Sequence, residues 1–425
     1  MTRKSSYVYN RLAAIAQNAP TIARRTMLDI ASATNVDNST TRKPCICIFS
    51  ALYEPHVGGV ESYTKGIAEA LVTAGCRVIV ATSNTDNATA LEAVNGIDIL
   101  RLPCNPLLNS RFPIPKNNQE SKRLWSWLNE QPIDYIVVNT RFYPHSILGL
   151  RFAKRHGIQP VLIEHGSAHL TLGNTLLDLP LHGVEHAMTA IVKRYSPCCY
   201  AVSGKASKWL SHFGFSSCGE VPNSIEADAY LGQASNRHFR SEFNIPDSAT
   251  LIASAGRFVP EKGVLQLAKA TQLASENGNS IFIIMAGNGP LLHDVEQLQY
   301  QTVITPGMLS KSDLSALLQQ ADCFCLPSRS EGFSTVLLEA AACSTAVIAT
   351  DVGGMREIAP TNEYGIILES MEPKDIAAAL TRAAANPEQI RRMGTNAAKR
   401  VRQLYTWDKS AQLLLHACKE AQLKR

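Results

Sequence analysis

The chain has 425 residues, of which 45 % are hydrophobic and 18 % are charged, and its formal net charge is +5. This length is too great for one ordinary hydrophobic core and suits two α/β domains with a cleft between them. No apolar run approaches the roughly 20 residues that cross a bilayer, so the composition excludes an integral membrane protein.

The positive charge is concentrated in residues 1–44, which hold seven basic and two acidic residues and so account for the whole excess. The neutral remainder argues against nucleic-acid binding, which uses a basic patch. Apolar and basic side chains alternate in this extension, so it is predicted either to contact anionic lipid peripherally or to be a basic leader, including an organelle transit peptide. No secretory signal pattern is present.

Eleven cysteines are scattered from Cys45 to Cys418 and are not paired at framework spacings. An odd, scattered set of thiols in apolar surroundings fits a reducing compartment, and we expect a cytoplasmic protein. The closely spaced pairs, Cys45 with Cys47 and Cys323 with Cys325, are predicted to be buried hydrophobes because no histidine or second pair completes a metal site.

The first half alternates strand and helix. Residues 45–50 form an apolar strand, residues 60–74 have helical spacing, and residues 77–81 form the next strand. These three elements predict a βαβ unit with parallel strands and a right-handed crossover. Further apolar runs continue the doubly wound pattern at residues 97–102, 135–138, 161–163 and 200–202.

The same alternation restarts in the second half. A strand at residues 251–255 is followed by a loop, a helix at 264–274 and a strand at 281–286. The later strands are predicted at 302–304, 323–326 and 346–349, and the helices at 311–320, 335–343 and 373–385. We therefore predict a basic extension at 1–44, Rossmann-like domains at 45–225 and 226–404, and a C-terminal helix at 405–425 that crosses between them.

Ligands of open parallel sheets lie beyond the carboxyl ends of the strands, usually at the loop after the first strand. In the first half this loop ends in Gly58 and Gly59 at a helix start, where backbone amides can meet a phosphate. In the second half it holds Arg257 and Lys262. Two cations at this position could be solvated surface charges, but the position favours a pyrophosphate-binding site.

The segment from Glu331 to Glu339 follows an apolar strand and starts a helix. Ser334 is predicted to be the N-cap, and Thr335 to open the helix. The two glutamates are about 12 Å apart along a helix axis, beyond the roughly 5–9.5 Å between the carboxylates of a glycosidase. A hydrolytic acid–base pair is therefore disfavoured.

These motifs resemble those of a known family. The segments GRFVPEKG, AGNGP and EGFSTVLLEA, in this order and at these separations, are similar to the donor-binding motifs of the retaining GT-B glycosyltransferases of family 4. The resemblance extends from residue 45 to the C-terminus and includes VGGVE, EHG, VPN and YTW. It implies two Rossmann-like domains that face a central cleft.

The resemblance also implies residue roles. Arg257 and Lys262 would neutralise the diphosphate of a nucleotide-sugar donor, and Glu339 would accept hydrogen bonds from the ribose hydroxyls. Glu331 would face the donor sugar and His165 would lie beside the transferred sugar. Backbone groups would complete the site, with Gly58, Gly59, Ser334 and Thr335 at the diphosphate and Gly287, Met308 and Leu309 at the base.

Two positions depart from the family pattern. Ser334 and Ser224 stand where the family often has glycine. Neither change removes a charge, so we expect an altered donor fit and hinge, and not a loss of activity. The hinge is expected at residues 223–232.

The predicted reaction is transfer of a sugar from a UDP- or GDP-linked donor to an acceptor hydroxyl, with retention at the anomeric carbon. No metal or other cofactor is expected, because the cations and helix starts can stabilise the leaving diphosphate and the sequence has no Asp-x-Asp motif. A glycan or lipid-linked acceptor is expected to bind at variable loops of the first half, which include residues 105–116 and 167–183. Synthesis of cell-envelope polysaccharide, exopolysaccharide or glycolipid would fit.

Other interpretations remain open. A nucleotide-sugar epimerase or a sugar phosphorylase can share the two-domain architecture. A non-catalytic sugar-nucleotide-binding protein is disfavoured, because it would have no reason to keep Arg257, Lys262, Glu331 and Glu339 together. A nicotinamide oxidoreductase is disfavoured because neither first loop has the dinucleotide fingerprint.

Overall fold

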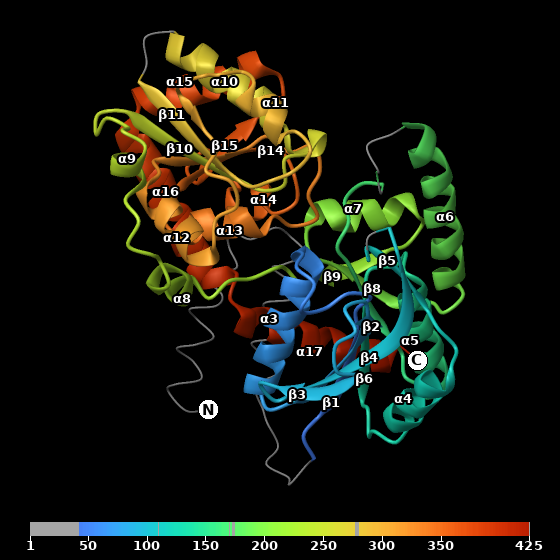
Figure 1. Ribbon diagram of the computed structural model, residues 1–425. Helices are drawn as coiled ribbons and strands as arrows, with labels where there is room; N and C mark the ends of the chain where they lie inside the picture. Colours follow the sequence, from blue (N-terminus) through green and yellow to red (C-terminus); the bar gives the residue numbers. More distant parts are fainter. Residues whose placement is uncertain (1–41, 109, 170, 172–174, 277–279, 425) are drawn as a thin grey trace, which may run out of the picture.

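A computed structural model of the chain describes residues 42–424, apart from 109, 170, 172–174 and 277–279. It shows two α/β domains, with the first below the second in Figure 1. The predicted lipid-contacting extension lies outside the described residues except for its last three. No described helix is long and apolar enough to cross a membrane.

The first domain is built on a sheet whose central strand is β1 (Cys45–Phe49). Every residue of β1 is buried, which explains its uninterrupted apolar sequence. The strand order is β3-β4-β2-β1-β6-β7-β8-β9, with β5 paired to β4. The other strands are β2 (Arg77–Asn84), β3 (Leu91–Val94), β4 (Ile97–Leu107), β5 (Phe112–Pro115), β6 (Tyr135–Asn139), β7 (Val161–Glu164), β8 (Cys198–Ala201) and β9 (Ser217–Glu220).

Two strands at one edge of this sheet run antiparallel to β4, namely β3 and β5. The sequence predicts neither of them, and it places a loop at 105–116 where the structure has a β hairpin. Leu107 pairs with Phe112 in this hairpin, so β4 continues well beyond the predicted residues 97–102. Alternating prolines in both strands hide the strand pattern in the sequence.

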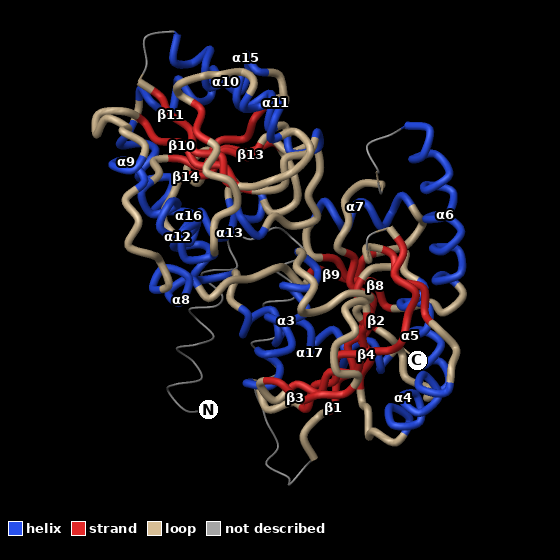
Figure 2. The backbone as a smooth tube through the Cα atoms, in the orientation of Figure 1, coloured by secondary structure: helices blue, strands red, loops and turns tan. Residues whose placement is uncertain are grey.

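Helices cover both faces of the first sheet (Figure 2). The second prediction of a loop, at 167–183, is wrong from residue 175 onward, because α6 begins there. Glu185, Thr189 and Val192 are buried at helical spacing, which holds this long helix against the domain. The helices are α3 (Gly59–Thr73), α4 (Gln119–Asn129), α5 (Pro144–Arg155), α6 (Thr175–Lys193) and α7 (Gly204–His212).

The second domain has a fully parallel sheet with the strand order β12-β11-β10-β13-β14-β15. Its strands are β10 (Thr250–Ala255), β11 (Ile281–Ala286), β12 (Val303–Ile304), β13 (Cys323–Leu326), β14 (Ala346–Thr350) and β15 (Gly365–Leu368). Its helical segments are α8 (Ala227–Gly232), α9 (Phe239–Glu242), η1 (Pro260–Lys262), α10 (Val264–Glu276), α11 (Leu292–Glu296), α12 (Lys311–Gln320), α13 (Thr335–Ala342), α14 (Met355–Ile358), α15 (Pro373–Ala385) and α16 (Pro387–Leu404).

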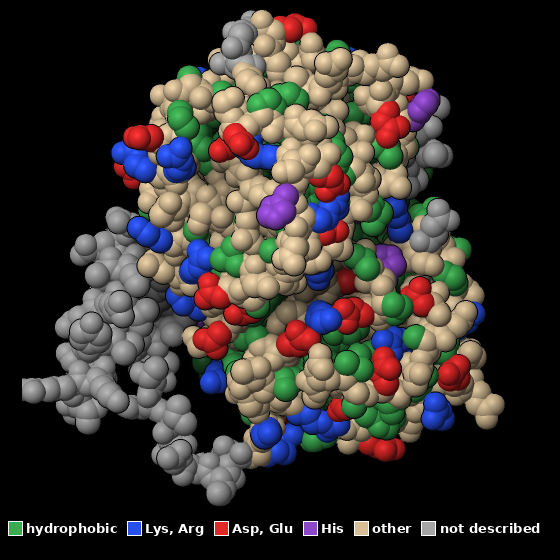
Figure 3. Space-filling model, turned by 60° about the vertical axis from the view of Figure 1, so that its left-hand side comes forward, with side chains coloured by type: hydrophobic (Ala, Val, Ile, Leu, Met, Phe, Trp, Pro, Cys, Tyr) green, Lys and Arg blue, Asp and Glu red, His purple; other side chains and the backbone are tan. Residues whose placement is uncertain are grey.

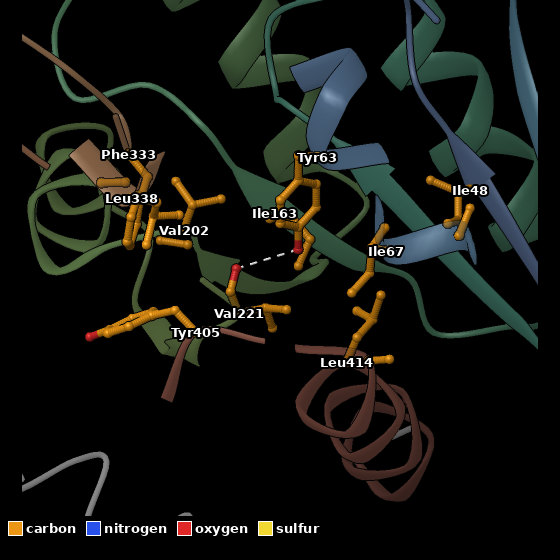
Figure 4. Close-up of a cluster of buried hydrophobic side chains, with 14 of the residues drawn as sticks. Ile48, Tyr63, Ile67, Ile163, Val202, Val221, Phe333, Leu338, Tyr405 and Leu414 are labelled. Carbon is orange, nitrogen blue, oxygen red and sulfur yellow. Dashed lines mark hydrogen bonds between the residues drawn. The ribbon is translucent and has the colours of Figure 1, made fainter. Parts of the chain in front are cut away.

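The chain crosses between the domains twice. It leaves the first domain before α8, and it returns at Tyr405 to form α17 (Trp407–Leu423), which packs against α3. The two crossings are joined by a hydrogen bond from the Ile225 amide to the Tyr405 carbonyl, 3.0 Å long. In Figure 4, Leu414 of α17 lies beside Ile67 of α3.

One hydrophobic core continues through both domains. In Figure 4, Val202 of the first domain lies next to Phe333 and Leu338 of the second, with Tyr405 of the crossing below them. The domains therefore share apolar contacts on the side of the cleft where the chain crosses.

Candidate active site

The order of the second sheet brings Lys262 and Glu331 together. The chain reverses its direction of winding between β10 and β13, which lie side by side, so the loops after these two strands meet at the carboxyl edge of the sheet. Lys262 is in the first loop and Glu331 in the second, and the Lys262 Nζ donates to Glu331 Oε1. Their side chains keep 21 % and 14 % exposure, so a ligand can still reach them.

His165 lies directly after β7, at the carboxyl edge of the first sheet. Burial lowers the pKa of His165 to about 3, so the imidazole is neutral at physiological pH. The His165 Nε2 lies 3.1 Å from Asn139 Oδ1, while the Asn139 amide group donates to Thr64 Oγ1. Because Oδ1 can only accept, Nε2 carries the proton and Nδ1 is left as an acceptor.

The loops that hold His165 and Glu331 are in contact across the domain boundary. A Cβ placed on Gly332 would lie 1.7 Å from the His165 carbonyl oxygen, so only glycine allows this approach. The Ser167 hydroxyl donates to the Glu331 carbonyl at 2.6 Å, and the Ser203 hydroxyl donates to the Gly332 carbonyl at 2.5 Å. The structure therefore pairs Lys262 with Glu331 and brings their loops against the loop that carries His165.

A cavity of about 820 Å³ between the domains holds a second group of predicted residues. Thr335 and Glu339 of α13 line it, one helical turn apart. Burial raises the pKa of Glu339 to about 7, although the positive charge of Lys311 and the Tyr230 phenol act in the opposite direction. Charged side chains of both signs gather along the seam between the two domains in Figure 3.

Ser334 precedes α13 at the N-cap position, but its side chain makes no capping hydrogen bond. Its amide instead donates to the Gly353 carbonyl at 3.1 Å. The first amides of α13 consequently lack a side-chain cap at the end of the helix where an anion binds best.

Gly58 and Gly59 begin α3, with Gly58 in an extended conformation at the N-cap. Their neighbours His56 and Glu61 line the same cavity from the first domain and are joined by a contact of 2.9 Å between Nδ1 and Oε1. Glu61 is buried, and a Cβ on Gly58 would clash with its carboxylate. Glu61 belongs to the VGGVE segment, but the sequence alone assigns it no role.

The remaining predicted residues lie along the carboxyl edge of the second sheet. Arg257 is exposed and makes no ion pair within the described part of the chain. Gly287 follows β11, and its amide donates to the Gly307 carbonyl at 2.8 Å, beside Met308 and Leu309. A Cβ on Gly287 would lie 1.9 Å from the Gly256 carbonyl oxygen, so the loops after β10 and β11 touch. Met308 is 77 % exposed, while Leu309 is partly buried.

Sequence reasoning missed the supports of His165. The Tyr63 ring lies edge-on to the imidazole, with ring centres 4.6 Å apart, and Asn139 orients its Nε2. It also missed the fully buried Arg141, whose guanidinium binds the carboxylates of Glu164 and Glu185. The residue types carry no sequence signal for these contacts, because the partners are 23 and 44 residues away.

Comparisons with known proteins agree with this geometry. Residues 57–229 match the family described as Glycosyltransferase Family 4, and residues 235–400 match Glycosyl transferases group 1. An uncharacterized glycosyltransferase of Methanocaldococcus jannaschii is 26 % identical over 87 % of this chain and 96 % of its own length. One of the subunits of human phosphatidylinositol N-acetylglucosaminyltransferase is 25 % identical over 86 % of this chain and 74 % of its own length.

Solved structures share the fold. Sucrose-phosphate synthase from Thermosynechococcus elongatus superposes with a TM-score of 0.65 at 21 % identity, and the match covers 90 % of this chain and all of that one. HepE from Anabaena, solved with UDP, gives a TM-score of 0.66 at 16 % identity and covers 89 % of this chain and all of its own. The chain therefore belongs to the family 4 glycosyltransferases, has the GT-B fold and is a hexosyltransferase-type enzyme.

Proposed function

We propose that the protein transfers a sugar from a nucleoside diphosphate sugar to an acceptor hydroxyl, with retention of the anomeric configuration. The observation that carries this proposal is the meeting of the Lys262–Glu331 ion pair with the His165 loop across the domain boundary. This arrangement puts the loop that carries a cation and a carboxylate in the second domain against the loop that carries a neutral imidazole in the first.

The roles follow from charge and position. Lys262 and Arg257 offer positive charge at the switch point of the second sheet, where a leaving diphosphate gains negative charge. The uncapped start of α13 offers backbone amides, and Glu339 can accept hydrogen bonds from ribose hydroxyls one turn further on. His165 Nδ1 can accept a hydrogen bond from a hydroxyl of the transferred sugar.

We propose a UDP- or GDP-linked donor and no metal at the diphosphate. Structures of HepE with UDP and with UDP-glucose support testing UDP first. The two cations Lys262 and Arg257 can take the place that a divalent ion has in metal-dependent transferases. Transfer should then proceed in buffer without added Mg²⁺ or Mn²⁺.

The proposed acceptor is a glycan or a lipid-linked glycan, as in cell-envelope, exopolysaccharide or glycolipid synthesis. Among the similar proteins are the human phosphatidylinositol N-acetylglucosaminyltransferase chain and WaaG, which is involved in lipopolysaccharide biosynthesis. Residues 1–44 would support such a role if they bring the enzyme to an anionic membrane surface.

The test combines donor binding with transfer. Isothermal titration with UDP, GDP and ADP identifies the base, and release of nucleoside diphosphate from the matching sugar donors measures turnover. Lys262→Ala should weaken binding of the preferred diphosphate at least tenfold, and Glu331→Gln should reduce kcat at least a hundredfold with little change in that affinity. Binding of no nucleoside diphosphate, or full activity in Glu331→Gln, would refute the assignment.

A further inference from the structure

Three histidines from separate segments of the first domain lie together, outside the candidate active site. His169 is in the loop after β7, His186 is on α6, and His212 is the last residue of α7. One ring nitrogen from each lies within 4.8 Å of the others. His169 is half-buried, while His186 and His212 are exposed, so an ion from solution can reach the cluster.

The three rings form a nearly equilateral triangle. Their centres are 5.4 Å apart for His169 and His186, 5.2 Å for His169 and His212, and 5.4 Å for His186 and His212. A zinc ion with Zn–N bonds of about 2.1 Å and tetrahedral angles places the centres of its imidazole ligands about 5.2 Å apart. The spacing of the three ring centres therefore already matches that of zinc-bound imidazoles, and their nitrogens lie within 4.8 Å of one another.

A buried carboxylate orients one of the rings. Glu185 Oε2 lies 2.9 Å from His169 Nδ1, and the Glu185 side chain is 1 % exposed. A carboxylate on Nδ1 keeps the proton there and leaves Nε2 as the electron-pair donor, which is the usual outer partner of a metal-bound histidine. The His182 ring stacks on His169 and the Trp209 indole stacks on His212, which restrict both rings further.

A network of buried charges lies next to the cluster. Arg141 is fully buried and contacts two buried carboxylates, those of Glu164 and Glu185. Glu185 links this network to the cluster, because its Oε1 contacts Arg141 and its Oε2 contacts His169. The buried guanidinium thereby holds in place the carboxylate that orients the His169 ring.

We propose that His169, His186 and His212 form a binding site for a divalent transition metal ion, with Zn²⁺ the best fit. Imidazole ligands suit Zn²⁺ and the neighbouring late first-row ions, and three protein ligands leave one position for water. The metal would tie α6 and α7 to the loop that carries His165. Since Ser203 and Gly204 at the start of α7 contact the second domain, it would also brace the active-site wall.

The test uses the untagged full-length chain, freed of metal by chelation and dialysis. Co²⁺ is titrated in as a spectroscopic probe, because tetrahedral Co²⁺ absorbs visible light, and Zn²⁺ is then added to displace it. The expected result is a band that saturates at one equivalent and disappears with Zn²⁺. Bound Zn²⁺ should also raise the apparent Tm.

The variants are His186→Ala and His212→Ala, whose exposed side chains can be removed without opening the core. Each should raise the Co²⁺ dissociation constant at least a hundredfold. His293→Ala removes an exposed histidine of the second domain and should leave the titration unchanged, as should Cys218→Ser, which removes an exposed thiol. Circular dichroism verifies that each variant is folded.

The proposal is overturned if no saturable absorption develops, if His186→Ala and His212→Ala keep the one-equivalent signal, or if Cys218→Ser loses it. This outcome is independent of the donor site, because nucleoside diphosphate binding by the second domain is measured separately in the same variants and should be unchanged.

Discussion

Gly332 of the second domain lies against the main-chain carbonyl of His165 of the first, so closely that a Cβ at position 332 would be 1.7 Å from that oxygen. The contact joins the loop after β13 to the loop after β7, and both loops carry predicted site residues. Whatever separates these two backbones should therefore separate the two halves of the active site.

Gly332→Ala tests this relationship. The added methyl group would clash with a backbone oxygen. Because Gly332 and His165 belong to different domains, the domains can relieve this clash by moving apart. We expect kcat/KM to fall at least about a hundredfold, since misplacement by an ångström is enough for such a loss. The two domains should remain folded, as judged by circular dichroism.

The matched control is Gly204→Ala, which adds the same group at the same boundary. The nearest atoms to its Cβ are carboxylate oxygens at 3.5 and 3.6 Å, which is ordinary contact. This variant should keep most of the activity. Equal activity in both variants would show that the contact at Gly332 is not formed during turnover.

We expect nucleotide binding to depend on pH because the pKa of Glu339 is raised. Because burial raises its pKa to about 7, the carboxyl group holds a proton in the free enzyme below that pH. Ribose hydroxyls donate best to the charged carboxylate, so binding in acid must first remove this proton. Affinity for the nucleoside diphosphate should be constant above pH 7 and fall by up to about tenfold per pH unit below it.

Isothermal titration from pH 5.5 to 8.5 measures this profile in the wild type and in Glu339→Gln. The variant has no group to titrate, so the difference between the two profiles removes the titration of the nucleotide phosphate itself. Parallel profiles would exclude Glu339 from ribose binding.

The same shift affects stability in the ligand-free protein. The folded-state pKa of about 7 is above the ordinary value of 4.5, so the native state holds more protons than the unfolded chain between these values. Stability contributed by this group is therefore greatest in acid and is lost as the pH rises through 7. The Tm of Glu339→Gln relative to the wild type should therefore rise between pH 5 and pH 8, as measured by differential scanning calorimetry.

Arg141 should be among the most sensitive core positions. Replacing it by Ala leaves Glu164 and Glu185 as buried carboxylates without their cation, and breaking a buried pair in this way costs about 3–5 kcal/mol. Arg141→Lys should also be destabilising, because one ammonium cannot bind both carboxylates as a guanidinium does.

Urea denaturation measures both changes. Arg42→Ala is the comparison, because Arg42 pairs with Asp134 at 53 % and 34 % exposure and such surface pairs contribute about 0–1 kcal/mol. A loss of stability in Arg141→Ala no greater than in Arg42→Ala would contradict the assignment.

Leu414 tests the attachment of the C-terminal helix. Its side chain is fully buried between α17 and the first domain, so Leu414→Ala should cost about 2–5 kcal/mol of folding free energy. Leu423 near the end of the same helix is 79 % exposed, and Leu423→Ala should change the stability by less than about 0.5 kcal/mol. Thermal unfolding measures both changes in stability, and an equal effect of the two substitutions would contradict the burial of Leu414.

The sequence by itself determined the elements whose pattern is local. The apolar strand at 45–50, the helices at 311–320 and 373–385 and the two cations Arg257 and Lys262 could all be predicted, because side-chain periodicity and loop position follow directly from the order of residues. The motifs also predicted the family, since they combine several such local features at defined separations.

Only the tertiary structure decided which of these residues meet. The Lys262–Glu331 pair joins residues 69 positions apart, and it depends on β10 and β13 being neighbours in the sheet. The buried Arg141 network and the histidine triangle depend on where α6 and α7 pack. Such contacts are set by strand order and helix packing, which arise from the burial of the whole core and leave no periodic trace in any one segment.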